Sequence, residues 1–312
     1  MLGALLLSSA ALGVMSMDCG GPETKVIALI GDSITHGTGS TARCQWPRPG
    51  DEACDAEVVE AFGLAGLGDG SLYAYGAALA AMLGEADDYE VDASDERKLL
   101  KHSWEVTREK GSTKDIDKIS VYSVGEKFLV FNLAQRQRKL AGAWNRWQQT
   151  WKFRFFVGEE PGYGKFGEEI WMPTWDAAIV LLGTNDAGVG STVTQDAYET
   201  GYKNILAPAV ENNGQKGQIF IGNKFGADPK KPLQGYDQHL LTEVFPAWDA
   251  HFAATSPLVN GGLVDFKKAI DDHYHLDIYE SLHLNYRGYR IMAQAAKAAI
   301  CSNLAQASSE QK

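Results

Sequence analysis

The sequence lacks several features that would direct it to particular classes of protein. It has four cysteines in 312 residues and no Cys-x-x-Cys pair, so a structural zinc site has little support. It has no excess of basic residues, because 29 Lys and Arg stand against 40 Asp and Glu, and the formal net charge of −11 argues against nucleic acid as the main partner. Apart from a polar tail over residues 308–312, it has no repeat or low-complexity tract.

The chain is long enough to bury a full hydrophobic core. At 312 residues and 45% hydrophobic composition, it fits one large domain or one domain with an insertion. Residues 1–17 are apolar up to the small and polar side chains near Ser16, which predicts a signal peptide even without a basic stretch before it. This run is short for a membrane span. We therefore expect a domain over residues 18–307 that is secreted or lies in a secretory-pathway lumen, with no membrane contact beyond the signal segment.

One apolar run ends at a turn that would expose a hydroxyl group. Residues 26–30 read Val-Ile-Ala-Leu-Ile, which is typical of a buried strand, and Gly31, Asp32 and Ser33 follow directly. In open α/β sheets, ligands bind beyond the carboxyl ends of the strands, so Ser33 is expected at the functional edge. Ser33 is therefore a candidate nucleophile, although Gly-Asp-Ser is also a common turn sequence.

Two further stretches carry polar side chains suited to catalysis. Residues 177–182 form a second apolar run, and the sequence Gly-Thr-Asn-Asp follows it over residues 183–186. Near the carboxyl end, Glu280 stands three residues before His283, ahead of an Ala-rich helical segment. A carboxylate, a histidine and a serine are the groups of a serine-hydrolase triad.

The remaining pattern alternates between strand and helix. Apolar runs over residues 218–222 and 262–266 predict strands. Helices are expected over residues 72–83, over residues 195–209 up to Pro208, and over residues 240–254 with a break at Pro246. Alternation of this kind predicts a parallel sheet with helices on both faces.

Taken in order, the three polar stretches resemble the sequence blocks of the SGNH hydrolases, also called the GDSL esterase and lipase family, over most of residues 25–91 and 172–304. The resemblance implies an α/β fold, a flavodoxin-like three-layer αβα sandwich with a parallel sheet. It also implies hydrolysis of acyl esters without a cofactor. In this family pattern Ser33 is the nucleophile, His283 is the base, and the Ser33 amide and the Asn185 side chain donate to the oxyanion.

Other residues of the same blocks are expected beside the substrate. His36 lies three residues after Ser33 and is a rival base, but the resemblance assigns the base to His283. His36 is therefore expected to line the pocket wall, and Asp32 and Asp186 are expected to contact the substrate.

The acid of the triad departs from the family pattern. The usual pattern is Asp-x-x-His followed by Pro, whereas here the position three before His283 is Glu280, and Leu284 replaces the Pro. Glu can orient an imidazole in serine hydrolases. Asp277, three residues further back, is a rival for that role.

The family's second block, a glycine whose amide helps to form the oxyanion hole, is missing from its expected place. It should follow a strand near residues 89–91, but no glycine occurs from there until Gly111. A later run over residues 127–134 resembles a displaced version, with Ala134 at the glycine position. Because the donor is a backbone amide, Ala134 could serve where the local φ is negative.

Residues 92–170 differ in composition from the rest of the chain. They have a charge balance of +3 within a chain of net charge −11, and they contain Trp104, Trp144, Trp147 and Trp151. The segment is interpreted as an insertion or a lid over the site, or as a stretch that is not truly coding. The last three tryptophans would share one helical face, which favours core packing over contact with a carbohydrate or a membrane.

The cysteines and histidines leave further alternatives. Cys44 and Cys54 could close a loop near Ser33, and Cys19 and Cys301 could join the chain ends, but four cysteines allow three connectivities. The alternating His and Asp residues over 273–277 could bind a metal, yet such a cluster is more typical of solvated side chains, and we predict no metal site.

Two hypotheses follow from the sequence. The first is a serine esterase that hydrolyses acyl esters, acetyl esters among them, of small molecules, carbohydrates or lipids. The second is a non-catalytic relative that binds a glycan or lipid and has an incomplete oxyanion hole. An amide donor that faces Ser33 from residues 92–170 would favour the first.

Overall fold

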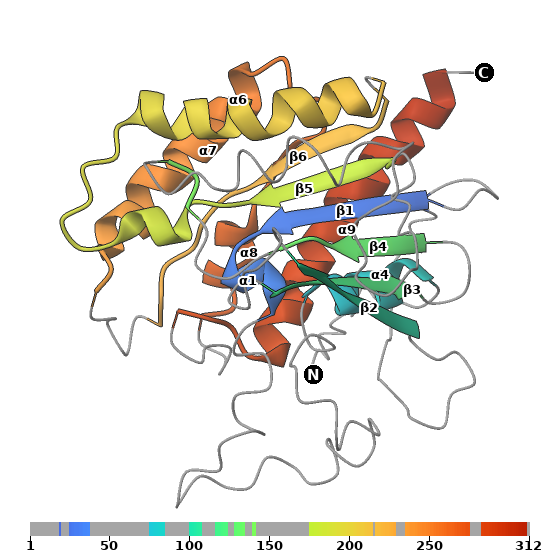
Figure 1. The fold of residues 1–312 in the computed structure, drawn as a ribbon, viewed down its shortest axis with the longest axis horizontal. Coiled ribbons are helices and arrows are strands. Elements are labelled where there is room, and N and C mark those ends of the chain that lie inside the picture. Colours follow the sequence, from blue (N-terminus) through green and yellow to red (C-terminus); the bar gives the residue numbers. More distant parts are fainter. Residues whose placement is uncertain are drawn as a thin grey trace, which may run out of the picture.

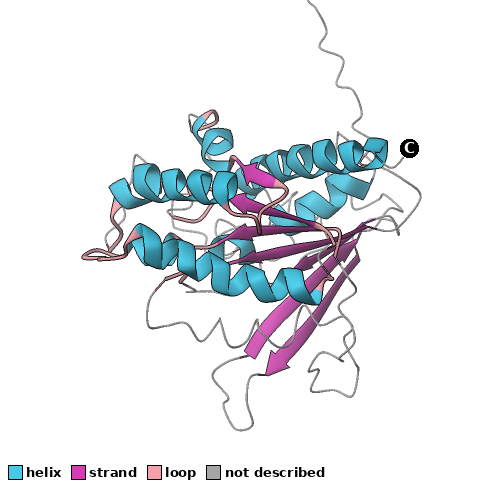
Figure 2. Ribbon diagram, turned by 90° about the horizontal axis from the view of Figure 1, so that it is seen from above, coloured by secondary structure: helices cyan, strands magenta, loops and turns pink. Residues whose placement is uncertain are grey.

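The structure is a computed structural model whose centre is a sheet with helices on both faces (Figures 1 and 2). It describes residues 19, 25–37, 75–84, 100–107, 116–123, 128–134, 139–141, 175–214, 216–228, 235–274 and 282–310. Every statement of structure below concerns these residues.

The sheet has seven strands in the order β2-β3-β4-β1-β5-β6-β7. Their bounds are β1 Lys25–Gly31, β2 Leu100–Thr107, β3 Ile116–Ser123, β4 Phe128–Asn132, β5 Ala177–Leu181, β6 Gln218–Gly222 and β7 Gly262–Val264. The five strands from β4 to β7 pair in parallel, and β2 and β3 add an antiparallel pair beyond β4. Ranked along the chain, the parallel strands have the order 2-1-3-4-5, which is the flavodoxin-like order. The predicted fold is confirmed.

The helices form the outer two layers of a three-layer sandwich (Figure 2). Their bounds are α1 Ser33–His36, α4 Tyr75–Gly84, η2 Thr184–Ala187, α6 Gln195–Asn212, η3 Leu240–Val244, α7 Phe245–Thr255, α8 Phe266–Asp271 and α9 Tyr286–Glu310. Helices α6 and α7 pack on one face of the sheet, and α4, α8 and α9 pack on the other.

Strand β1 shows why its sequence is continuously apolar. Val26, Ala28 and Ile30 belong to the core on the α6 and α7 face, whereas Ile27 and Leu29 belong to the core on the α4 and α9 face. Side chains of a strand alternate between the two faces of a sheet, so a strand covered by helices on both sides has no polar position.

Two prolines are accommodated differently from the sequence prediction. Helix α6 continues through Pro208 to Asn212, so the predicted end at Pro208 is wrong. Leu206 and Ala209 are buried in the core on either side of it, and this packing outweighs the hydrogen bond that proline cannot make. Pro246 lies in the first turn of α7, which follows the π-helical turn η3 without a break.

Part of the atypical segment over residues 92–170 is integral to the sheet. It contributes β2, β3 and β4, and β4 lies inside the sheet beside β1. The described remainder is the short stretch over residues 133–134 and 139–141, and Trp144, Trp147 and Trp151 lie outside the described residues. Strand β4 thus takes the place next to β1 that the displaced second block requires.

A disulfide joins Cys19 to Cys301 in helix α9, with 4.4 Å between the two Cα atoms. The two cysteines are 282 residues apart in the sequence, and both are buried. This pairing is one of the alternatives that the sequence left open, and Cys44 and Cys54 lie outside the described residues.

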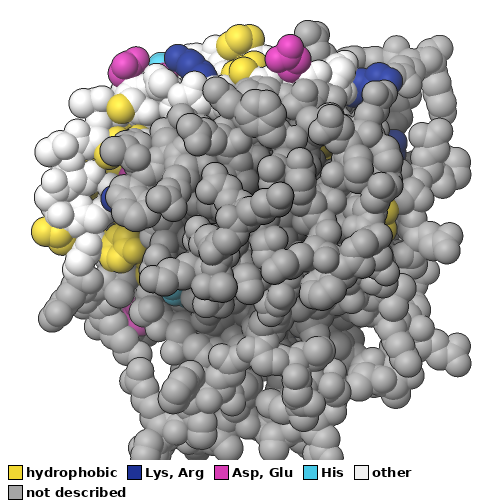
Figure 3. Space-filling model, in the orientation of Figure 1, with side chains coloured by type: hydrophobic (Ala, Val, Ile, Leu, Met, Phe, Trp, Pro, Cys, Tyr) yellow, Lys and Arg dark blue, Asp and Glu magenta, His cyan; other side chains and the backbone are white. Residues whose placement is uncertain are grey.

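On the face shown in Figure 3, acidic and basic side chains of the described residues are interspersed along one edge. Within the part of the chain that the structure describes, no helix has the length and apolar character needed to cross a membrane.

Candidate active site

Ser33 lies at the carboxyl end of β1, where the strand turns directly into the short helix α1. Asp32 caps this helix, because its Oδ1 accepts a hydrogen bond of 3.0 Å from the Ile34 amide. Gly37 ends the helix with a φ of 90°, a conformation that favours glycine. Gly31 is equally required, since a side chain there would overlap Thr35. Ser33 is therefore held on a tight turn between two fixed ends.

His283 meets this serine from the far end of the chain. Its Nε2 lies 2.8 Å from Ser33 Oγ, across a sequence separation of 250 residues. Leu282 and Leu284, on either side of it, are 4% and 0% exposed and belong to the cores on opposite faces of the sheet. Two buried neighbours fix the backbone at His283, and the distance suits proton transfer from the hydroxyl to a neutral imidazole.

Asn185 approaches from the neighbouring strand. Gly31 of β1 pairs with Leu181 of β5, so the chain after each strand emerges at the same edge of the sheet. This edge between β1 and β5 is the point at which the strand order reverses, the usual ligand site of such sheets. Gly183 has a φ of 116°, and it turns the chain into η2, which carries Asn185. Asn185 Oδ1 accepts a hydrogen bond of 3.1 Å from the Tyr236 hydroxyl.

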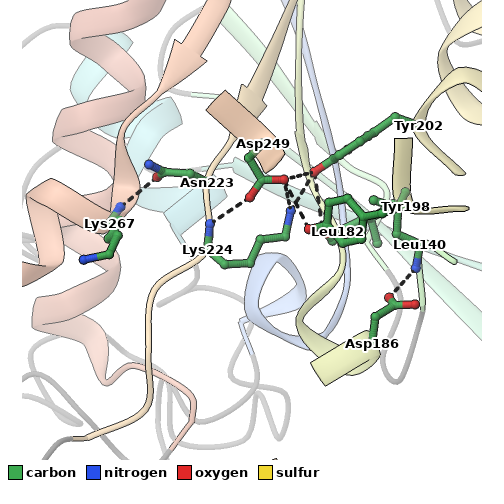
Figure 4. A network of polar contacts seen from close by, with 9 residues as sticks. All are labelled: Leu140, Leu182, Asp186, Tyr198, Tyr202, Asn223, Lys224, Asp249 and Lys267. Atoms are coloured by element: carbon green, nitrogen blue, oxygen red, sulfur yellow. Dashed lines mark hydrogen bonds and ion pairs between the residues drawn. The ribbon is translucent and has the colours of Figure 1, made fainter. Parts of the chain in front are cut away.

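Asp186 is buried and bound to the backbone. Its two carboxylate oxygens accept hydrogen bonds from the amides of Leu140, at 2.6 Å, and Ala141, at 2.9 Å. Figure 4 shows the contact with Leu140. Burial raises the pKa of Asp186 from 3.8 to about 6, although these amides act in the opposite direction. The residue predicted to contact substrate thus fastens residues 139–141 to η2 and is 2% exposed.

Asp32 is a second buried carboxylate at this edge. It is fully buried, and burial raises its pKa from 3.8 to about 6, against the lowering effects of the Ile34 amide, Thr184 and the charge of Lys224. Its Oδ2 has no hydrogen-bond partner among the described residues. The proximity of Asp32 to Thr184 brings the serine turn and η2 together.

Asn132, at the end of β4, connects the third strand of this edge to the serine helix. Its Nδ2 donates a hydrogen bond of 2.8 Å to the Thr35 carbonyl in α1. Its Oδ1 accepts a hydrogen bond of 3.2 Å from the Ala134 amide, the amide predicted to serve the oxyanion. Ala134 therefore lies at the expected edge, with its N–H directed to Asn132 in this structure.

A buried ion pair lies close to Leu182, which directly follows β5 (Figure 4). Lys224 Nζ lies 2.8 Å from Asp249 Oδ1 and 2.6 Å from the Tyr202 hydroxyl. Burial lowers the pKa of Lys224 and raises that of Asp249, and their mutual attraction opposes both shifts. The hydroxyls of Tyr198 and Tyr202 also lie 3.4 and 3.3 Å from the Leu182 carbonyl, just before the turn that carries Asn185.

The structure brings Ser33, His283, Asn185 and Ala134 to one edge of the sheet. The side chain of His36 and both candidate acids, Glu280 and Asp277, lie outside what the structure describes. Among the described residues, no cluster of His, Cys, Asp or Glu has the arrangement of a metal site.

Sequence reasoning missed two polar residues of the site, Tyr236 and Asn132. Asn132 could have been found, because it is the first polar residue at the end of an apolar run, as Asp32 is at the end of the run that forms β1. Tyr236 follows no strand or motif, and its sequence context carries no comparable signal.

No model of a known protein family matches the sequence, and no curated protein matches it either. Several solved structures are similar to this one in fold. The LAE5 α/β hydrolase from the metagenome of Lake Arreo, Spain, is 14% identical with a TM-score of 0.49, over 88% of this chain and 94% of that one. A putative GDSL-like lipase from Parabacteroides merdae is 13% identical with a TM-score of 0.48, over 89% and 96%.

An acetyl-xylooligosaccharide esterase from Geobacillus, Axe2, is 14% identical in one variant with a TM-score of 0.49, over 91% of this chain and 96% of that one. These solved structures thus include a GDSL-like lipase, and the sequence blocks around Ser33, Asn185 and His283 resemble those of the GDSL, or SGNH, hydrolases.

Proposed function

We propose that the protein is a serine esterase that hydrolyses acyl esters of small molecules, carbohydrates or lipids. The observation that carries the proposal is the 2.8 Å contact between Ser33 Oγ and His283 Nε2, formed at the carboxyl edge of the parallel sheet. A serine within hydrogen-bond reach of a histidine is the arrangement of an activated nucleophile.

The reaction proceeds in two steps. His283 takes the proton of Ser33 as the serine oxygen attacks the ester carbonyl, and the alcohol leaves with a proton from His283. Water, activated by His283, then releases the acid from the acyl-enzyme. Glu280 or Asp277 orients the imidazole.

The oxyanion is bound by the Ser33 amide and the Asn185 side chain. Ala134 is the third predicted donor, and its N–H must then turn away from Asn132 or be shared with it. Loss of one oxyanion donor typically costs ~10²–10³ in rate, so an incomplete hole gives a slow enzyme.

The test is hydrolysis of p-nitrophenyl acetate and of longer acyl esters by the purified protein, with Ser33→Ala and His283→Ala as paired variants. We expect both substitutions to abolish turnover, because each removes a group that reacts. The control is a serine far from the site in sequence: Ser302→Ala, on the surface of α9, should leave turnover unchanged. Turnover that is unchanged in both site variants would be background or contaminant activity. It would contradict the proposal and favour a non-catalytic glycan- or lipid-binding protein.

We also propose that the protein is secreted or lies in a secretory-pathway lumen. The disulfide between Cys19 and Cys301 supports this, because disulfides persist in oxidising compartments. Recovery of the expressed full chain from the culture medium, cleaved near residue 17, is the expected result.

A further inference from the structure

The carboxamide of Asn185 must be held with one particular end toward the substrate. An oxyanion is stabilised by the Nδ2 hydrogens, whereas Oδ1 in the same place would repel it. A donor that binds Oδ1 from the protein side favours the orientation in which Nδ2 is left for the substrate. The Tyr236 hydroxyl is such a donor, at 3.1 Å from Asn185 Oδ1.

Tyr236 is itself held against the turn that carries Asn185. It forms an isolated antiparallel bridge with Gly188, directly after η2. On one side the Asp237 amide donates to the Ala187 carbonyl at 2.7 Å, and on the other the Val189 amide donates to the Gly235 carbonyl at 3.0 Å. The tyrosine and the turn therefore form one backbone-bonded unit.

The Tyr236 hydroxyl keeps the proton that it donates to Asn185. Tyr236 is partly buried against the core on the α6 and α7 face of the sheet. Partial burial and the negative charge of Asp32, next to Ser33, both raise the pKa of Tyr236. The phenol therefore keeps its proton and remains a hydrogen-bond donor over the working pH range of an esterase.

We infer that Tyr236 is a positioning residue of the ester hydrolysis proposed above, on which this inference rests: its hydroxyl holds Asn185 Oδ1 so that Nδ2 is directed at the oxyanion. Tyr236 acts through Asn185 and does not itself react. Its effect belongs to the transition state and the tetrahedral intermediate, because the bound ester carries no oxyanion.

The test compares kcat and KM of Tyr236→Phe, Asn185→Ala and the double variant. We expect Tyr236→Phe to lower kcat by ~10-fold or more with KM little changed, and Asn185→Ala to lower it by ~10²–10³. The double variant should be no slower than Asn185→Ala, because the tyrosine has nothing left to orient. Asn185→Asp keeps the oxygen that accepts from Tyr236 but lacks the N–H, and should be as slow as Asn185→Ala.

Two controls separate the possible failures. Tyr274→Phe, at a tyrosine that is 57% exposed, should match the wild type and report the cost of removing a hydroxyl elsewhere. Ser33→Ala reports whether the esterase proposal holds. If Ser33→Ala is inactive while Tyr236→Phe equals the wild type, or if the two losses multiply in the double variant, the positioning role is overturned and the esterase stands. If the activity does not depend on Ser33, the esterase proposal fails and the role of Tyr236 fails with it.

Discussion

Asp32 and Asp186 are each required for local structure, yet each is costly when ionised. Asp32 caps the helix that begins at Ser33, and Asp186 holds two backbone amides of residues 139–141. Both are buried, and both have a pKa of about 6 in the folded protein, compared with 3.8 ordinarily. Between pH 3.8 and 6 the folded chain keeps protons that the unfolded chain has released. Stability contributed by these groups is therefore present at low pH and is lost as the pH rises through about 6.

We predict that Asp32→Asn flattens this pH dependence. The amide keeps an oxygen for the Ile34 N–H, and it cannot ionise. The free energy of unfolding should rise at pH 7 by up to about 3 kcal/mol relative to the wild type, and by less at pH 5, where wild-type Asp32 is largely protonated. Urea unfolding at the two pH values measures both. An equal slope in Asp32→Asn and in the wild type would refute the assignment.

At the scale of elements, one buried ion pair and the tyrosines around it connect α6, α7 and the chain after β6. Lys224 follows β6, Asp249 lies in α7, and Tyr198 and Tyr202 lie in α6. The Lys224 ammonium also lies 5.2 Å from the centres of both tyrosine rings. All four side chains are fully or almost fully buried, so water does not solvate or screen the ion pair. Because Tyr198 and Tyr202 also contact the Leu182 carbonyl after β5, the network fixes α6 and α7 relative to the strand that leads to Asn185.

Breaking this pair from one side should be far more costly than breaking a surface pair. Lys224→Met leaves Asp249 buried without its cation, and we expect it to lower the free energy of unfolding by about 3–5 kcal/mol. Lys267→Met is the matched control, because Lys267 pairs with Asp271 at the surface of α8, where a pair contributes less than about 1 kcal/mol. Lys224→Met combined with Asp249→Asn should recover part of the loss, since no carboxylate then remains buried and unpaired. Urea unfolding measures both changes. Equal losses in the two lysine variants would show that the buried pair stabilises the fold no more than the surface pair does.

The elements show what the sequence can predict and where tertiary contacts decide. Strands β1, β5 and β6 were predictable because helices cover both of their faces and leave an unbroken apolar run. The pairing of Ser33 with His283 was predicted from motifs, since the residues are 250 positions apart and no local pattern links them. The burial of Lys224 and the contact of Tyr236 with Asn185 depend on loops that meet only in the folded chain. Lysine is almost never fully buried without a partner, and the sequence does not show that partner.

At the scale of the whole molecule, the two ends of the described chain are joined. Cys19 lies six residues before β1, the strand that leads to Ser33. Cys301 lies in α9, the helix that begins three residues after His283. The disulfide therefore links the segments that carry the nucleophile and the base. Both cysteines belong to the core on the α4 and α9 face of the sheet, so the disulfide is buried in that core.

We predict that removal of this link destabilises the whole fold without first disturbing the active site. The bond closes a loop of 282 residues, and long loops gain the most conformational entropy when released, so Cys301→Ser should lower the free energy of unfolding by about 2–5 kcal/mol. Esterase activity at low temperature should remain, because neither cysteine touches Ser33 or His283 in the proposed mechanism. Thermal unfolding with and without a reducing agent measures the effect, and Cys301→Ser should become insensitive to reductant if this bond accounts for the wild-type response. A wild type that melts at the same temperature under both conditions would mean that the core holds the two ends together without the disulfide.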